Sequence, residues 1–104
     1  MTIERLPELL RPLFWDYDFE SLGWPASRDL VIVRVLQNGG DDAVRWLLQV
    51  MGHAELGEWI RQHRGGGMDP RRLRFWQLML DLPDEEVNGW IEALRALPGS
   101  GRFP

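Results

Sequence analysis

One run of aliphatic, β-branched residues limits the folds that are open to this chain. Residues 30–36 read LVIVRVL, a composition typical of a β-strand. A strand needs a partner for its backbone hydrogen bonds, and the sequence offers no second run of this kind. The segment therefore favours a helix, with a strand as the alternative. The chain as a whole is expected to be all-α.

Six helical segments are expected in this chain. Apolar spacing, together with proline and glycine breakers, places them at about 4–10, 25–37, 41–51, 53–64, 69–81 and 83–97. Asp69 before Pro70 is a strong start signal, because aspartate caps a helix and proline suits its first position. Asp41 or Asp42 is expected to cap the third helix.

The domain organisation is expected to be simple. Residues 1–98 are predicted to form a single compact helical domain, and residues 99–104 a flexible C-terminal tail. ELGEWI at 55–60 resembles EVNGWI at 86–91, so the last four helices are expected to form two similar helical hairpins. The match reflects either a true duplication or the spacing shared by all amphipathic helices.

Composition excludes several catalytic chemistries. The sequence has no cysteine and no lysine, and its 12 basic residues are all arginine. Thiolate, disulfide and Schiff-base chemistry are therefore excluded, and no Gly-x-Ser-x-Gly or phosphate-loop motif occurs. We expect no enzymatic activity, no cofactor and no metal.

The charge and hydropathy pattern bears on location and partners. The net charge of −4 argues against nonspecific binding to nucleic acid or anionic membranes. The chain has no secretion-type start and no apolar run long enough to span a bilayer, so a soluble, cytoplasmic protein is expected.

Residues 14–19 interleave aromatic and acidic side chains in a way that no amphipathic helix shows. The pattern predicts a turn or short extended stretch that pins several rings. Asp16 and Asp18 are a carboxylate pair of the kind that binds magnesium, but the strand and Gly-Ser turn of nucleotidyltransferases are missing, so turn capping is favoured. An exposed tryptophan among Trp15, Trp24 and Trp90 would suit an interface anchor.

Five arginines gather between residues 61 and 74, where Asp69 is the only acid. This arginine cluster consists of Arg61, Arg64, Arg71, Arg72 and Arg74. The segment carries a formal charge of +4, and the rest of the chain −8. It suits contact with a protein partner, contact with nucleic-acid phosphates, or plain solvation. A helix-turn-helix reader is disfavoured, because the fifth helix offers few polar side chains for reading bases.

Several motifs resemble those of a small bacterial family of all-helical domains of unknown function. They are LFWDYDF at 13–19, SLGW at 21–24, RDLV at 28–31, RWL at 45–47 and FWQLML at 75–80. The resemblance covers about residues 13–90, and its first motif is the most specific. The family differs around 65–69, where this chain has three glycines in place of a serine- or threonine-containing cap.

Genes of that family often stand beside an abortive-infection-type nucleotidyltransferase toxin. The resemblance therefore implies an antitoxin-like module that binds and restrains such a toxin. Phe14, Trp15, Asp16 and the arginine cluster are the predicted partner contacts. A nucleic-acid-binding regulator that uses the same arginines is the alternative function.

Overall fold

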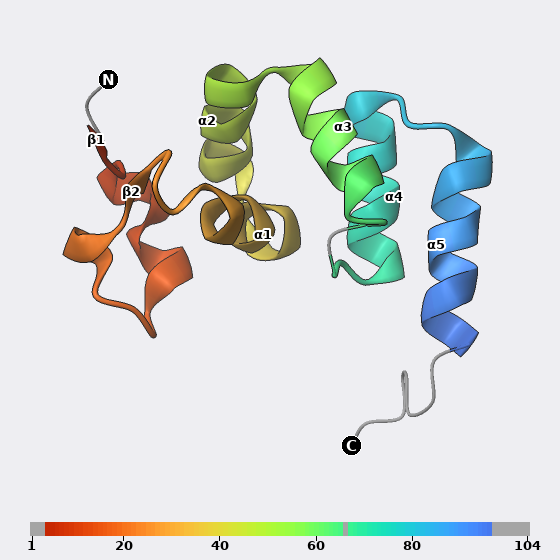
Figure 1. The fold of residues 1–104 in the computed structure, drawn as a ribbon, viewed down its shortest axis with the longest axis horizontal. Helices are drawn as coiled ribbons and strands as arrows, with labels where there is room; N and C mark the ends of the chain where they lie inside the picture. Colours follow the sequence, from red (N-terminus) through yellow and green to blue (C-terminus); the bar gives the residue numbers. More distant parts are fainter. Residues whose placement is uncertain (1–3, 66, 97–104) are drawn as a thin grey trace. The chain divides into compact units, whose positions relative to one another are not determined.

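The computed structural model describes residues 4–65 and 67–96 (Figure 1). Helices dominate these residues, so the all-α prediction is confirmed. The chain divides into two compact units, one ending at Gly52 and the other beginning at His53, and each is described by itself. The single domain over 1–98 stays a prediction, and the tail at 99–104 lies outside the described residues.

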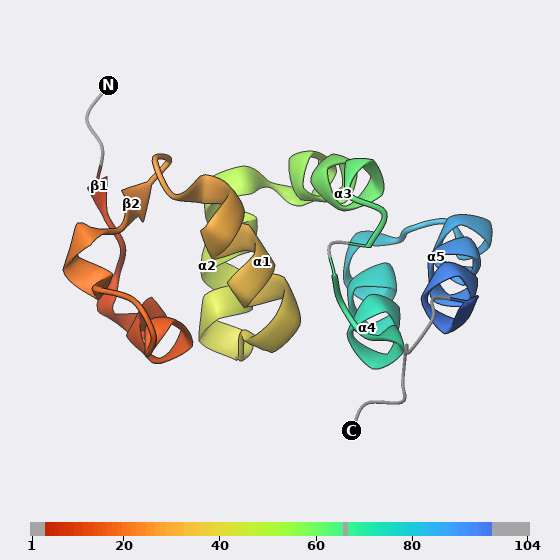
Figure 2. The same cartoon turned by 60° about the horizontal axis from the view of Figure 1, so that its bottom comes forward.

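The first unit begins differently from the prediction. Strands β1 (Glu4–Arg5) and β2 (Gly23–Trp24) form a short antiparallel pair (Figure 2). Two 3-10 helices lie between them in sequence, η1 (Glu8–Phe14) and η2 (Phe19–Ser21). A helix over 4–10 was wrong because Pro7 favours extended backbone before it and lacks the N–H that a helix interior needs.

Two α-helices complete the first unit, α1 (Arg28–Asn38) and α2 (Asp41–Met51). The run at 30–36 lies within α1, so the helix was the correct alternative. Its Val31, Ile32, Val35 and Leu36 are fully buried, on the side that packs against α2 and η1. Gly40 occupies the N-cap of α2 without a side-chain bond, so the predicted aspartate caps lie in the first turn instead.

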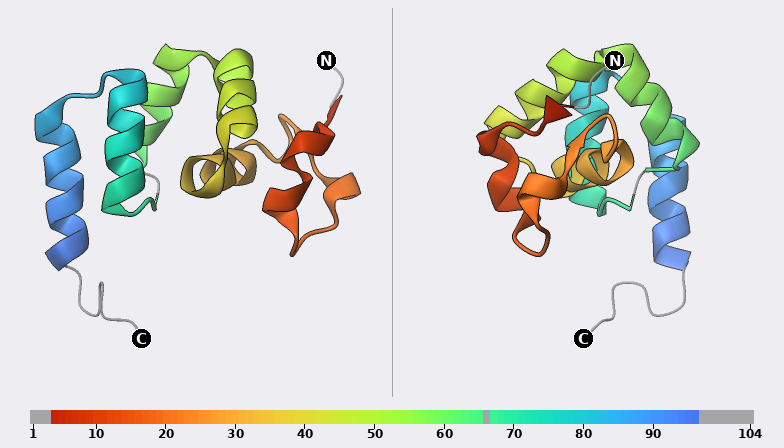
Figure 3. Two further views of the ribbon diagram at one scale, coloured as in Figure 1. Left: turned by 180° about the vertical axis from the view of Figure 1, so that it is seen from behind. Right: turned by 60° about the vertical axis from the view of Figure 1, so that its left-hand side comes forward.

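The second unit holds α3 (His53–Gln62), α4 (Pro70–Leu80) and α5 (Asp84–Ala96). Asp69 caps α4 as predicted, accepting a 2.9 Å hydrogen bond from the Arg72 backbone N–H. Helices α4 and α5 run antiparallel side by side (Figure 3), and α3 also packs against α4. Trp76 of α4 lies in the core of this unit.

Of the two predicted hairpins, the one formed by α4 and α5 is confirmed. By contrast, α2 packs against α1 in the first unit, whereas α3 belongs to the second unit and packs against α4. The second predicted hairpin would join helices of two different units, so it stays a prediction. No helix in the described part of the chain is long and apolar enough to cross a membrane.

Candidate functional site

The aromatic turn at 14–19 buries some of its rings and exposes another. Phe14 is 1% exposed and contacts the rings of Tyr17 and Phe19, with centroids 6.3 and 6.1 Å away. Trp15, the next residue, is 84% exposed. The predicted turn is confirmed. Phe14 was also predicted to contact a partner, and this prediction is corrected because its side chain lies in the core. Trp15 keeps that role as a prediction.

Arg34 of α1 holds this turn in place. Its Nη1 donates to the Leu13 carbonyl oxygen at 2.7 Å and to Asp16 Oδ1 at 2.9 Å, while Nη2 donates to Oδ2 at 2.8 Å. The guanidinium also lies over the Tyr17 ring, 5.2 Å from its centroid. A planar, five-donor group suits such a fork, and lysine would not replace it. Arg34 lines the same hollow as Trp15, and the sequence analysis missed it.

The acids of the turn are not turn caps. Both carboxylate oxygens of Asp16 bind Arg34. Asp18 precedes η2 without a side-chain capping bond. Among the described residues, no group of three or more histidine, aspartate or glutamate side chains is placed to hold a metal ion. Asp16 therefore orients the turn through an ion pair, which corrects the capping prediction.

The Asp16–Arg34 pair makes stability depend on pH. Hydrogen bonds from Arg34 lower the pKa of Asp16 below its ordinary value of 3.8. Because the pKa of Asp16 is lower in the folded state than in the unfolded state, the ion pair stabilises the fold at any pH above the unfolded-state pKa. This stabilisation is lost as the pH falls through the folded-state pKa. The wild type is therefore expected to unfold at a higher temperature than Asp16→Asn near neutral pH, by a margin that shrinks below about pH 4.

Thermal unfolding of both proteins across this pH range measures the effect. Asp18→Asn is the matched control, because its carboxylate makes no ion pair within the described residues. Arg11 binds Glu8 and Glu20 in both proteins, so the difference between them isolates Asp16. A margin that stays constant down to the most acidic point would contradict the assigned role of the pair.

The arginine cluster lies at the junction of α3 and α4, and most of it is engaged. Arg61 forms a bidentate pair with Glu86 of α5, with Nε 2.8 Å from Oε1 and Nη2 2.9 Å from Oε2. Arg74 donates to Gln77 at 2.8 Å and lies 3.6 Å from the Asp84 carboxylate.

The other three arginines differ in what they contact. Arg72 stacks its guanidinium over the Phe75 ring, 5.0 Å from the centroid. Burial lowers the pKa of Arg72 below its ordinary value, against a smaller opposing effect from the charge of Asp69. Arg64 and Arg71 make no side-chain hydrogen bond or ion pair within residues 4–65 and 67–96, so they are the members of the cluster available to a partner.

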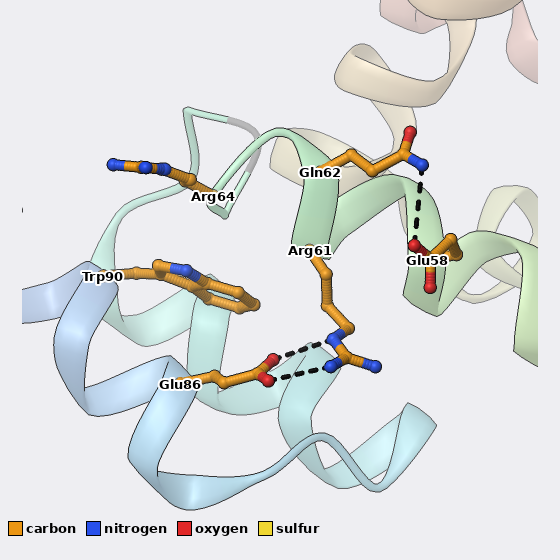
Figure 4. A pocket seen from close by; sticks show the side chains of 6 residues that line it. All are labelled: Glu58, Arg61, Gln62, Arg64, Glu86 and Trp90. Atoms are coloured by element: carbon orange, nitrogen blue, oxygen red, sulfur yellow. Dashed lines mark hydrogen bonds and ion pairs between the residues drawn. The ribbon is translucent and has the colours of Figure 1, made fainter.

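A hollow of about 330 Å³ opens beside the cluster (Figure 4). Its lining residues are Glu58, Arg61, Gln62, Arg64, Glu86 and Trp90. Figure 4 shows Arg61 and Glu86 pointing toward each other, with the Trp90 ring between this pair and Arg64. Two arginines and two glutamates line the hollow, so its formal charge is zero. This balance makes it a poor phosphate site.

The predicted contact residues thus belong to two different units of the chain. Trp15 and Asp16 lie in the first unit, and the arginine cluster lies in the second. Of the three tryptophans considered as anchors, Trp15 is exposed, whereas Trp24 and Trp90 are half-buried. Glu86 was missed because its partner Arg61 is 25 residues away, and no local pattern connects them.

The fold and these surfaces define a small helical protein with an exposed tryptophan, Trp15. Residues 9–60, which make up half of the chain, match a family of unknown function, DUF6922, and the chain belongs to this family. The match includes the motifs at 13–19, 21–24, 28–31 and 45–47, but not the one at 75–80. No curated protein and no solved structure matches the chain.

Proposed function

We propose that this protein is an interaction module that acts as a cytoplasmic antitoxin, binding and restraining a nucleotidyltransferase-type toxin. The observation that carries the interaction is Trp15, which is 84% exposed and lines a hollow of about 360 Å³. Tryptophan is among the side chains that dominate binding energy at protein interfaces. Single exposed apolar side chains are common, so it is the combination of a large ring with the hollow that it lines that favours a binding role.

The environment of Trp15 suits an anchor. Phe14 before it is buried, and Asp16 after it is held by Arg34, so the backbone on both sides is fixed. A side chain presented from a fixed backbone loses less conformational entropy on binding. The interaction role therefore rests on a preorganised aromatic side chain.

The antitoxin role rests on the resemblance of the 13–19 motif to domains encoded beside nucleotidyltransferase toxins. An antitoxin of this kind needs a binding surface and no catalytic group. Restraint by direct contact is consistent with the exposed Trp15.

Co-expression with a nucleotidyltransferase toxin encoded beside a gene of this family tests the proposal. The wild-type chain is expected to restore growth and to elute with the toxin in gel filtration. If it neither relieves toxicity nor forms a complex, the antitoxin function is wrong.

Trp15→Ala is expected to weaken the complex about thirtyfold, the typical loss for a central aromatic anchor. Titration calorimetry with the purified toxin measures this change. Leu78→Ala is the control, because Leu78 is 85% exposed on α4 of the other unit. Equal losses for both variants would indicate nonspecific adhesion through exposed apolar side chains.

A nucleic-acid-binding regulator remains the second candidate, because Arg64 and Arg71 lack partners among the described side chains. Retardation of RNA or DNA at low salt, decreasing as salt rises, would favour it. The double variant Arg64→Ala/Arg71→Ala is expected to abolish such binding. No retardation by the wild type even at low salt would eliminate this candidate.

A further inference from the structure

Two adjoining hollows run along the first unit. The first, about 360 Å³, is lined by Pro12, Leu13, Trp15, Asp16, Arg34, Gln37 and Asn38. The second, about 380 Å³, is lined by Leu9, Pro12, Leu13, Asn38, Gly40, Asp41, Asp42 and Ala43. They share Pro12, Leu13 and Asn38, so they form one continuous depression, here called the η1 groove.

The η1 groove has an apolar wall that comes from the 3-10 helix η1 and from Trp15, which follows it. Leu9 is 43% exposed and lines one hollow, Trp15 lines the other, and Leu13 lines both. Apolar side chains displayed together in a concave surface gain free energy when another apolar surface covers them. The groove therefore suits apolar side chains of a partner.

The two ends of the groove differ in charge. At the Trp15 end, Asp16 is neutralised by Arg34. At the other end, Asp41 and Asp42 are exposed and form no ion pair within the described residues. They lie in the first turn of α2, where the helix terminus supplies roughly half a positive charge, which two carboxylates outweigh. One end of the groove is thus negative and unpaired.

We propose that the η1 groove takes a peptide segment of the partner protein that combines apolar side chains with lysine or arginine. The apolar side chains occupy the hollows beside Leu13 and Trp15, and the basic group pairs with Asp41 and Asp42. This proposal rests on the proposed function, because it names the chemistry of the toxin segment that would be bound. Charge complementarity sets the orientation of the segment along the groove.

The charge pattern favours this occupant over two others. Nucleic-acid phosphates would be repelled by the unpaired acids at the α2 end. A second copy of this chain offers only Arg64 and Arg71 as unengaged members of its arginine cluster, and its net charge of −4 opposes its approach to these acids. A segment with both apolar and basic side chains can cover the apolar wall and also pair with the acids at the charged end.

A synthetic amphipathic peptide of leucine and lysine is the probe, with a leucine–glutamate peptide of the same pattern as its control. The protein's six tryptophan indole N–H groups are followed by ¹⁵N NMR during titration. The lysine peptide is expected to shift the Trp15 signal and leave the Trp90 signal in place. A shift at Trp90 instead, or equal binding of the glutamate peptide, overturns the proposal.

The double variant Asp41→Asn/Asp42→Asn tests the charged end. It is expected to weaken lysine-peptide binding about tenfold, since each surface charge pair contributes modestly. Glu85→Gln/Glu92→Gln removes the same charge from exposed positions of α5 and is expected to leave binding unchanged. Equal loss in both double variants would show attraction to net charge only.

If the aspartate variant loses helix content, Leu9→Ser provides a second test. It removes an apolar side chain from the wall of the groove without changing α2. It is expected to lower the affinity for the lysine peptide several-fold. Movement of the Trp15 signal with protein concentration, without peptide, would identify a second copy as the occupant and overturn the proposal.

Co-expression separates this proposal from the proposed function. If the wild type binds the toxin and Asp41→Asn/Asp42→Asn binds it equally well, the groove proposal fails and the antitoxin function stands. If the lysine peptide binds at Trp15 but no toxin complex forms, the groove stands and the antitoxin function fails.

Discussion

Trp76→Ala is expected to lower the free energy of unfolding of the second unit by about 3–5 kcal/mol, the usual cost of removing a buried tryptophan. The Trp76 side chain is 0% exposed and meets the Phe75 ring edge-on, with centroids 5.3 Å apart. The variant loses apolar burial and leaves a cavity that its neighbours fill only in part. Urea unfolding followed by circular dichroism measures the loss.

Leu78→Ala is the matched control for this prediction, because it lies on the same helix and is 85% exposed. It is expected to change the free energy of unfolding by less than about 0.5 kcal/mol. Similar losses for the two variants would contradict the placement of Trp76 in the core and Leu78 at the surface.

Gly65→Ala is expected to lower the free energy of unfolding by about 1–3 kcal/mol. Gly65 has a φ of 94°, a conformation that side-chain-bearing residues rarely adopt. A Cβ there would lie 3.0 Å from Leu73 Cδ2 and 3.7 Å from Trp90 Cβ. The turn after α3 therefore needs glycine both for its backbone and for its close approach to α4 and α5. Chemical denaturation gives the difference directly.

Gly89→Ala supplies a control of opposite sign in the same unit. Gly89 lies within α5, and apart from its chain neighbours and the backbone of its own helix no atom of the described residues lies within 4 Å of the position its Cβ would take. Alanine in a helix interior is expected to raise stability by about 0.5–1 kcal/mol. If both variants lost a similar amount of unfolding free energy, the backbone conformation at Gly65 would not be the reason that this position needs glycine.

Helix positions were largely predictable because their signals are local. The cap at Asp69 and the proline at position 70 mark the start of α4 within two adjacent residues. The run at 30–36 was assigned to a helix because an unpaired strand leaves backbone groups unsatisfied. The start of η1 was missed, because Pro7 and Pro12 disfavour a regular α-helix without specifying what replaces it.

The candidate site was less predictable, because it depends on pairs that are distant in sequence. Arg34 and Asp16 are 18 residues apart, and Arg61 and Glu86 are 25 apart. Neither pair leaves a periodic trace in the sequence. The arginine cluster was visible as composition, but only its contacts distinguish Arg64 and Arg71 from the engaged members.

The sequence by itself determined the helical class of this protein, the charge of its segments and the chemistries it lacks, because these depend on composition and on spacing over a few residues. Only the tertiary structure decided that Phe14 enters the core while Trp15 points to solvent. Adjacent aromatic residues have nearly equal gains from burial, so packing partners choose between them. Arg34, which reaches the turn from α1, binds the Leu13 carbonyl oxygen and Asp16 and so fixes the backbone on both sides of these two rings.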